Sequence, residues 1–215
     1  MAQLRAILWD LDGTLTDSAP LIMQCVAGTM KSLAGVDRPP ESYHELVGPP
    51  LLDGFRLLGV AEDDLVRYVH EYRRRYNEVR DETPLFPGVV DVLHKLAQHQ
   101  VPMAVATSKQ ENLAQQVCEV TGIAPYFTVI AGAPSGTEPS TKGEVVRSAI
   151  ERLNIEDLAS DAVVMIGDRI YDIRGAEDNG IRTILVTWGS GTPEEWALAW
   201  RTVETPDELL ELLLA

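Results

Sequence analysis

Long apolar segments are missing from this chain of 215 residues, and cysteines and basic side chains are scarce. No apolar run approaches the roughly 18 residues that a membrane-spanning helix needs, so we expect no transmembrane helix and no membrane partner. The opening residues MAQLRAILWDLDG contain no basic leading segment, and their short apolar run ends in carboxylates. We therefore expect no secretory signal peptide.

Positive charge is in deficit throughout the chain. The 18 lysines and arginines are outnumbered by 33 aspartates and glutamates, which gives a formal net charge of -15. Nucleic acid is bound by basic patches that neutralise its phosphates, so this balance speaks against a nucleic-acid partner. A small phosphate can still bind to an acidic protein where cationic groups are focused locally.

Cysteine is limited to Cys25 and Cys118, which lie far apart, each in a helix-like apolar pattern. We expect buried free thiols, and a cytoplasmic location follows as the default. A composition of 45% hydrophobic and 24% charged residues is ordinary for a globular protein. The length suffices for one large core, or for a core with a small second unit.

The pattern of apolar residues changes at residues 83–88, where TPLFPG is a strong breaker of regular structure. Before it, residues 17–83 show helical spacing and no convincing strand. After it, strands alternate with helices: strands at 102–106, 127–131, 162–166 and 182–187, and helices at 88–99, 109–121, 142–153 and 172–179. This alternation predicts an α/β fold with a doubly wound, Rossmann-like parallel sheet. We predict a core of residues 1–16 and 85–215, with residues 17–84 forming an inserted all-helical cap.

Two carboxylates, Asp10 and Asp12, directly follow the apolar residues 4–9. Side chains at positions i and i+2 of a strand lie on the same face, so these anions are brought together. One interpretation is an Asp-Gly turn with solvated carboxylates. The other is a site for a hard divalent cation with oxygen ligands, for which Mg²⁺ fits.

Hydroxyl groups follow the next strand. Ser108 and Glu111 have the spacing of a helix capping box, which predicts a structural role for Ser108. Thr107 is then free to offer its hydroxyl to an anion beside the backbone N–H groups of the helix start. Thr107, together with Ser108, is our candidate for phosphate binding.

A lysine and two further aspartates follow later strands. Thr141 and Glu144 form a second predicted capping box, which places Lys142 in the first helical turn. Lys142 is either a solvated surface lysine or the local positive focus that a phosphate requires. Asp168 ends an apolar strand, and Asp172 stands at a helix start, as an N-cap or as part of a metal site with Asp10 and Asp12.

The order of these motifs resembles that of the haloacid dehalogenase (HAD) superfamily: Asp-x-Asp-Gly-Thr, a Thr-Ser pair, a lysine and Gly-Asp-x-x-x-Asp. The chain is most similar to its phosphoglycolate-phosphatase-like members with a helical cap. The resemblance implies that Asp10 is the nucleophile and a Mg²⁺ ligand. It makes Asp12 the general acid/base, with its main-chain carbonyl on the metal. The chain departs from the usual pattern at Gly143, where proline is common, and at Arg169, where a small residue is frequent.

The resemblance assigns the remaining site residues as well. Thr107 and Lys142 would hold the transferring phosphoryl group, Asp168 would bind Mg²⁺ directly, and Asp172 would support the metal through water. The helical insertion would act as a lid, with the turn containing Gly48 and Pro49 reaching the site.

Other insertion residues receive weaker assignments. Arg56, on the helix after that turn, is a second candidate for substrate contact. The basic run at residues 73–75 reads as a solvated helix face, and Asp17 as the cap of the first helix of the insertion. No residue of the insertion identifies a substrate.

We therefore expect a Mg²⁺-dependent phosphatase acting on small phosphorylated metabolites such as phosphoglycolate, sugar phosphates or nucleoside 5′-monophosphates. It would be a monomer or a weak homodimer. A sugar-phosphate mutase of the same superfamily is the main alternative. A dehalogenase would need neither Asp12 nor a metal site, and a phospho-accepting receiver would need an aspartate after strand 127–131, where Ala131-Gly132-Ala133 stands. A partner-binding relative without catalysis is the remaining alternative.

Overall fold

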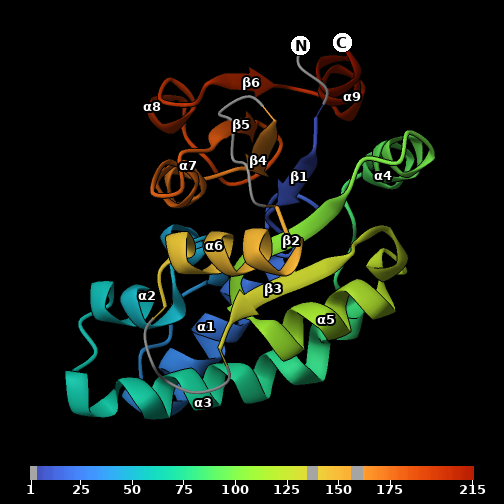
Figure 1. Cartoon of the computed structure of the whole chain (residues 1–215). Coiled ribbons are helices and arrows are strands. Elements are labelled where there is room, and N and C mark those ends of the chain that lie inside the picture. Colours follow the sequence, from blue (N-terminus) through green and yellow to red (C-terminus); the bar gives the residue numbers. More distant parts are fainter. Residues whose placement is uncertain (1–3, 135–139, 156–161) are drawn as a thin grey trace.

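A parallel β-sheet forms the centre of the computed structural model, which describes residues 4–134, 140–155 and 162–215 (Figure 1). Within these residues the sheet has six strands in the order β3-β2-β1-β4-β5-β6. The strands are β1 (Ala6–Trp9), β2 (Met103–Gln110), β3 (Val129–Ala133), β4 (Val163–Gly167), β5 (Arg182–Val186) and β6 (Arg201–Val203). This is the order of doubly wound dinucleotide-binding sheets, so the predicted fold class is confirmed.

Strand β1 lies inside the sheet and is apolar on both faces. Trp9 is in register with Val105 of β2 and with Ile166 of β4. Because side chains alternate along a strand, Ile7 and Trp9 join one buried cluster, while Ala6 and Leu8 join another on the opposite face. A strand covered on both faces needs the continuous apolar run seen at residues 6–9.

Helices cover both faces. Helices α6 (Lys142–Arg152) and α7 (Ile170–Glu177) pack on the face of Ala6 and Leu8. The other face is covered by α4 (Val89–Gln98), α5 (Glu111–Val120) and α9 (Pro206–Leu214). In Figure 1, α4 and α9 lie on the side of the sheet away from α6 and α7. Short elements complete this part: the 3₁₀ turn η3 (Ala124–Tyr126) and α8 (Pro193–Trp196).

Residues 17–84 form helices and, as predicted, contribute no strand to the sheet; the structure describes all of them. The elements are α1 (Ala19–Ala34), η1 (Pro40–Leu46), α2 (Leu51–Leu57), α3 (Glu62–Val79) and η2 (Arg80–Glu82). Figure 1 shows α1, α2 and α3 gathered at one end of the molecule. The chain leaves the sheet and returns at one place, because Thr16 and Leu85 form an antiparallel bridge. Below, residues 17–84 are called the helical insertion.

Two local predictions were wrong, and three elements were missed. The Ser108–Glu111 capping box does not form, because β2 continues through Ser108 and α5 begins only at Glu111. Asp17 does not cap α1, whose N-cap position is Ser18 without a side-chain cap hydrogen bond. The C-terminal β6, α8 and α9 were not predicted at all.

The described part of the chain can be searched for membrane-spanning helices and for disulfides. No helix there is both long enough and apolar enough to cross a membrane. Cys25 and Cys118 are both buried and unpaired, as expected.

Candidate active site

The predicted site residues meet where neighbouring strands of the sheet end. Asp10 follows β1, Asp168 follows β4, and Thr107 lies near the end of β2. Since β1 lies between β2 and β4, these three side chains come from adjacent strands. Strand order reverses direction between β1 and β4, and ligands of open α/β sheets bind in the crevice at such a switch point.

Three buried carboxylates form a cluster at this point. One oxygen from each of Asp10, Asp168 and Asp172 lies within 4.8 Å of the other two. The residues are only 6%, 1% and 2% exposed, respectively. Burial raises the pKa of Asp10 to about 7, although Lys142 opposes this. Burial, with the charges of Asp172 and Asp10, also raises the pKa of Asp168 well above its usual range.

This cluster fits a divalent cation. The three carboxylates are desolvated and repel one another, so a bound cation would stabilise their charged forms. Carboxylate oxygens are also the ligands that hard cations prefer. The haloacid dehalogenase resemblance assigned Asp10 and Asp168 to a metal, and the structure brings both together. It brings Asp172 equally close, whereas the resemblance had placed it behind a water molecule.

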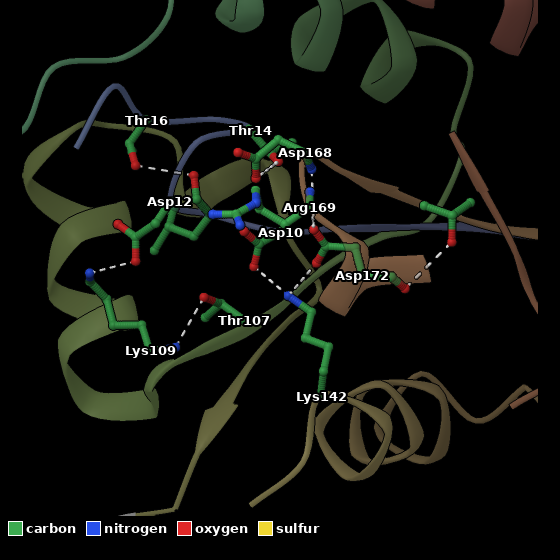
Figure 2. A network of polar contacts seen from close by, with 12 residues as sticks. Asp10, Asp12, Thr14, Thr16, Thr107, Lys109, Lys142, Asp168, Arg169 and Asp172 are labelled. Atoms are coloured by element: carbon green, nitrogen blue, oxygen red, sulfur yellow. Dashed lines mark hydrogen bonds and ion pairs between the residues drawn. The ribbon is translucent and has the colours of Figure 1, made fainter. Parts of the chain in front are cut away.

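Lys142 joins two of the carboxylates. Its ammonium nitrogen lies 2.5 Å from Asp10 Oδ1 and 2.7 Å from Asp172 Oδ1 (Figure 2). Burial alone would lower the pKa of Lys142, but the two carboxylates raise it above its ordinary value, so the ammonium stays charged. The predicted Thr141–Glu144 capping box is present and starts α6 at this lysine. Lys142 is therefore a buried cation at the site and not a solvated surface lysine.

Asp172 organises the loop after β4. Its Oδ2 accepts hydrogen bonds from the backbone N–H groups of Asp168 (3.1 Å) and Arg169 (3.0 Å). Helix α7 begins at Ile170, so Asp172 is its third residue and not its N-cap. One carboxylate thus shapes the loop and contacts Lys142.

Asp168 is held by residues that the sequence did not single out. The N–H of Ser190 donates to Asp168 Oδ2 at 2.7 Å, and Thr14 Oγ1 lies 3.4 Å from Oδ1. A Cβ at Gly189 would overlap the Gly13 carbonyl and the Asp168 side chain, so only glycine fits there. The glycines of Trp188-Gly189-Ser190-Gly191 were the available signal for this loop.

Asp12 points away from the carboxylate cluster. Its Oδ2 lies 2.6 Å from the ammonium of Lys109, and its Oδ1 accepts a hydrogen bond from Ser18 Oγ at 2.6 Å. Among the described residues, its side chain is not part of the cation-binding group. Lys109, to which the sequence assigned no role, also lies 4.2 Å above the ring centroid of Tyr76. It thereby links β2 to helix α3 of the insertion.

An open cavity of about 670 Å³, which includes space open to solvent, lies between the strand ends and the helical insertion. Its walls include Asp10, Asp12, Thr107 and Ser108 from the sheet. Thr107 is 1% exposed, and its hydroxyl oxygen accepts a hydrogen bond from the Lys109 N–H at 3.2 Å. Ser108 thus lies at the cavity as a strand residue, although its predicted capping role was wrong.

The opposite wall of the cavity comes from the insertion, through Gly48, Pro49, Tyr72, Arg73 and Tyr76. Gly48 and Pro49 thus line the same cavity as Asp10, and their contact with substrate stays a prediction.

Two arginines of the insertion are placed otherwise than expected. Arg56 is not among the residues that line the cavity; its guanidinium lies 2.7 Å from both Asp53 and Glu62 at the surface. Arg73 lines the cavity and is partly buried, whereas Arg74 is exposed and pairs with Glu71 and Glu78. The solvated-face interpretation therefore suits Arg74 but is wrong for Arg73.

The fold and the site together define a doubly wound α/β protein with a buried carboxylate cluster beside a cavity. Comparison with known proteins gives its family. A sequence model of the haloacid dehalogenase-like hydrolases matches residues 7–186, so the chain belongs to this family. The chain is therefore an enzyme of the haloacid dehalogenase-like hydrolase type.

Individual relatives are similar over most of the chain. The tyrosine-protein kinase PtkA of Mycobacterium tuberculosis is 34% identical over 97% of this chain and 72% of its own. A 5′-nucleotidase of Pseudomonas aeruginosa is 33% identical over 88% of this chain and 85% of its own. The crystal structure of a predicted phosphatase from Clostridium acetobutylicum superimposes with a TM-score of 0.93 at 34% identity, covering 99% of both chains.

Proposed function

We propose that this protein hydrolyses small phosphomonoesters in a Mg²⁺-dependent reaction in which Asp10 becomes phosphorylated. The observation that carries the proposal is the buried group of Asp10, Asp168 and Asp172 beside an open cavity, with Lys142 joining Asp10 to Asp172. Such a group would combine a nucleophilic carboxylate with two cations, Lys142 and a bound metal ion, that offset the charge of the phosphate.

The carboxylates of Asp10 and Asp168 would hold the metal, with Asp172 beside them and the main-chain carbonyl of Asp12 as a further ligand. An all-oxygen site of this kind suits Mg²⁺. The bound ion would offset the negative charge of the phosphoryl oxygens as the nucleophile approaches.

The protein's own groups would divide the reaction into two displacements. An Asp10 oxygen forms a bond to phosphorus while the bond from phosphorus to the leaving oxygen breaks. Asp12 gives its proton to that oxygen, while Lys142 and Thr107 bind the transferred phosphoryl group. Asp12 then removes a proton from the water that attacks phosphorus, which releases inorganic phosphate and restores the Asp10 carboxylate.

Two rearrangements are required before the first displacement. Lys142 must shift part of its contact from Asp10 to the phosphoryl oxygens. Asp12 must give up its contact with Lys109 or with Ser18, because those two donors hold both of its oxygens.

We further propose that residues 17–84 act as a lid that excludes water and selects the leaving group. The cavity is lined both by residues at the strand ends, such as Asp10, and by insertion residues, such as Gly48. Candidate substrates are phosphoglycolate-type acids, sugar phosphates and nucleoside 5′-monophosphates; the last are supported by the relative named a 5′-nucleotidase. A cytoplasmic location and a monomeric or weakly dimeric state belong to the same proposal.

Two alternative reactions would transfer the phosphoryl group to an acceptor other than water. A mutase would return it to a sugar, and the relative PtkA is named a tyrosine-protein kinase. Isomerisation of a hexose 1-phosphate and labelling of a tyrosine peptide from ATP are therefore the two comparison assays.

The decisive experiment measures phosphate release from a panel of phosphomonoesters with Mg²⁺ and with EDTA. We expect release only with the metal, and a loss of at least about 10³-fold in kcat for Asp10→Asn, which removes the nucleophile. Asp37→Asn is the matched control, because Asp37 is exposed and pairs only with Lys31 among the described residues. Near-full activity of Asp10→Asn, or no release from any ester, would overturn the proposal.

A further inference from the structure

Arg169 connects the loop of the carboxylate cluster to the helical insertion. Its Nη1 donates a hydrogen bond to the carbonyl of Val47, which is in the insertion. Its Nε donates to Glu195 Oε2 at 3.0 Å, and Nη2 lies 3.4 Å from Oε1. The side chains of Arg169 and Glu195 are only 12% and 15% exposed, so this is a partly desolvated pair and not a surface contact.

The insertion approaches Arg169 without a side chain between them. Gly48 has φ +109°, and a Cβ built there would lie 2.9 Å from Arg169 Cγ. The turn at residues 47–50 therefore rests directly on the arginine side chain. Gly48 and Pro49 of this turn are also cavity residues opposite Asp10.

Arg169 is fixed on the side of the core as well. Its backbone N–H donates to Asp172 Oδ2 at 3.0 Å, while Asp172 Oδ1 pairs with Lys142. Glu195 belongs to the capping box of α8, where its Oε2 accepts from the N–H of Thr192 at 3.2 Å. Glu195 therefore holds one side of the guanidinium, and Nη1 on the other side reaches the carbonyl of Val47 in the 47–50 turn.

We propose that Arg169 is a positioning residue that latches the 47–50 turn over the cavity and thereby limits the size of the leaving group. This inference rests on the proposed phosphatase function. Removing the guanidinium would leave the Val47 carbonyl without its donor and would free the turn to move away from Asp10. Small leaving groups would lose enclosure, whereas bulky ones would gain room.

The test compares Arg169→Ala and Arg169→Lys with Arg152→Ala. Arg152 is a matched control, because it also joins a glutamate (Glu111, 2.7 Å) to a backbone carbonyl (Ile130, 3.2 Å), but on the core and away from the insertion. The probes are phosphoglycolate, with a small leaving group, and 4-nitrophenyl phosphate, with a bulky one.

For Arg169→Ala we expect the ratio of kcat/KM values to move toward the bulky ester by at least about fivefold. Arg169→Lys, which keeps one donor, should recover part of the shift, and Arg152→Ala should leave the ratio unchanged. An equal loss on both esters would indicate general damage to the site and would overturn the proposal, as would an unchanged ratio.

Amide hydrogen exchange gives a readout that does not depend on activity. We expect faster exchange in residues 44–58 of Arg169→Ala, with unchanged protection in β4. Unchanged exchange in residues 44–58 would contradict the latch. If the wild type hydrolysed neither ester, the phosphatase proposal would fail while exchange would still decide on the latch. Should Arg169→Ala not fold, Glu195→Gln, which weakens the anchor and keeps Arg169, takes its place in both measurements.

Discussion

Two buried lysines determine the electrostatics of the site at the level of single residues. Lys142 pairs with Asp10 and Asp172, and Lys109 pairs with Asp12. The local positive focus that a phosphate needs is thus present in a chain of net charge -15, but each cation already has an anionic partner. Removing either lysine would leave buried carboxylates without their cation, and breaking a buried ion pair in this way costs about 3–5 kcal/mol.

The raised pKa of Asp10 predicts how stability depends on pH. Burial raises this pKa from 3.8 to about 7, so between these pH values the folded protein retains a proton that the unfolded chain has lost. Rising pH therefore lowers the free energy of unfolding across this window, by about 1.4 kcal/mol per pH unit for one group. In EDTA we expect the Tm, measured by thermal denaturation, to fall between about pH 5 and pH 7 and to level off above that.

Two comparisons identify the source of this pH dependence. Asp10→Asn should reduce the slope, because the substituted group does not titrate, and saturating Mg²⁺ should flatten it in the wild type. A Tm that rises with pH in EDTA, or a slope that Asp10→Asn leaves unchanged, would contradict the assignment.

At the level of elements, the start of α6 places Lys142. The Thr141 side chain accepts from the Glu144 N–H at 3.2 Å, directly before the lysine. We expect Thr141→Ala to cost about 1 kcal/mol of stability and to lower kcat, because the first turn of α6 frays. Denaturant unfolding and steady-state rates are the measurements.

Thr205→Ala is the control for this prediction. Thr205 caps α9 in the same way, by accepting from the Glu208 N–H at 3.2 Å, and among the described residues neither cavity wall includes it. We expect Thr205→Ala to lose about as much stability as Thr141→Ala, without a change in kcat. Equal loss of kcat in the two variants would mean that the effect on rate is global.

The two capping-box predictions show how far local sequence specifies an element. The Thr141 pattern succeeded, whereas the same pattern at Ser108 failed because Gln110 pairs with Ala133 and extends β2. Glu111 then accepts from the Gly132 N–H and from Arg152 instead of closing a cap. Contacts 21 and 41 residues away decided the outcome, and no local pattern contains them.

The same distinction applies to the site. Asp10, Thr107, Lys142 and Asp168 follow strands whose apolar character is visible in the sequence, so their convergence was predictable from parallel pairing. Ser190 reaches Asp168 from a loop after β5, which only the folded sheet brings near. The ion pairs of Arg56 with Asp53 and Glu62, and the place of Arg73 at the cavity, depend on the path of the chain between helices, which no local pattern contains.

At the level of the whole molecule, one apolar cluster continues from the sheet into the insertion. It contains Cys25 of α1 and Cys118 of α5. Burial raises the pKa of Cys25 to about 11 and that of Cys118 to about 12, so both remain neutral thiols at pH 8. Because the thiolate is the reactive form, we expect neither to react with a disulfide reagent in the folded protein.

Denaturation provides the positive control for this prediction, since both thiols should then react. Rapid reaction of one thiol at pH 8 under native conditions would show that the cluster opens locally at that helix. The measurement therefore reports on opening of the shared core at two separate positions.

The bridge between Thr16 and Leu85 has an evolutionary consequence. The Asp17 N–H donates to the Pro84 carbonyl at 2.9 Å, and the Phe86 N–H donates to the Leu15 carbonyl at 3.1 Å. The points where the chain departs and returns are thus joined by backbone hydrogen bonds, whatever lies between them. A segment of different length or ancestry could be spliced in at this point without altering the order of the strands. If the insertion selects the leaving group as proposed, exchanging it would change that selection while the sheet stayed the same.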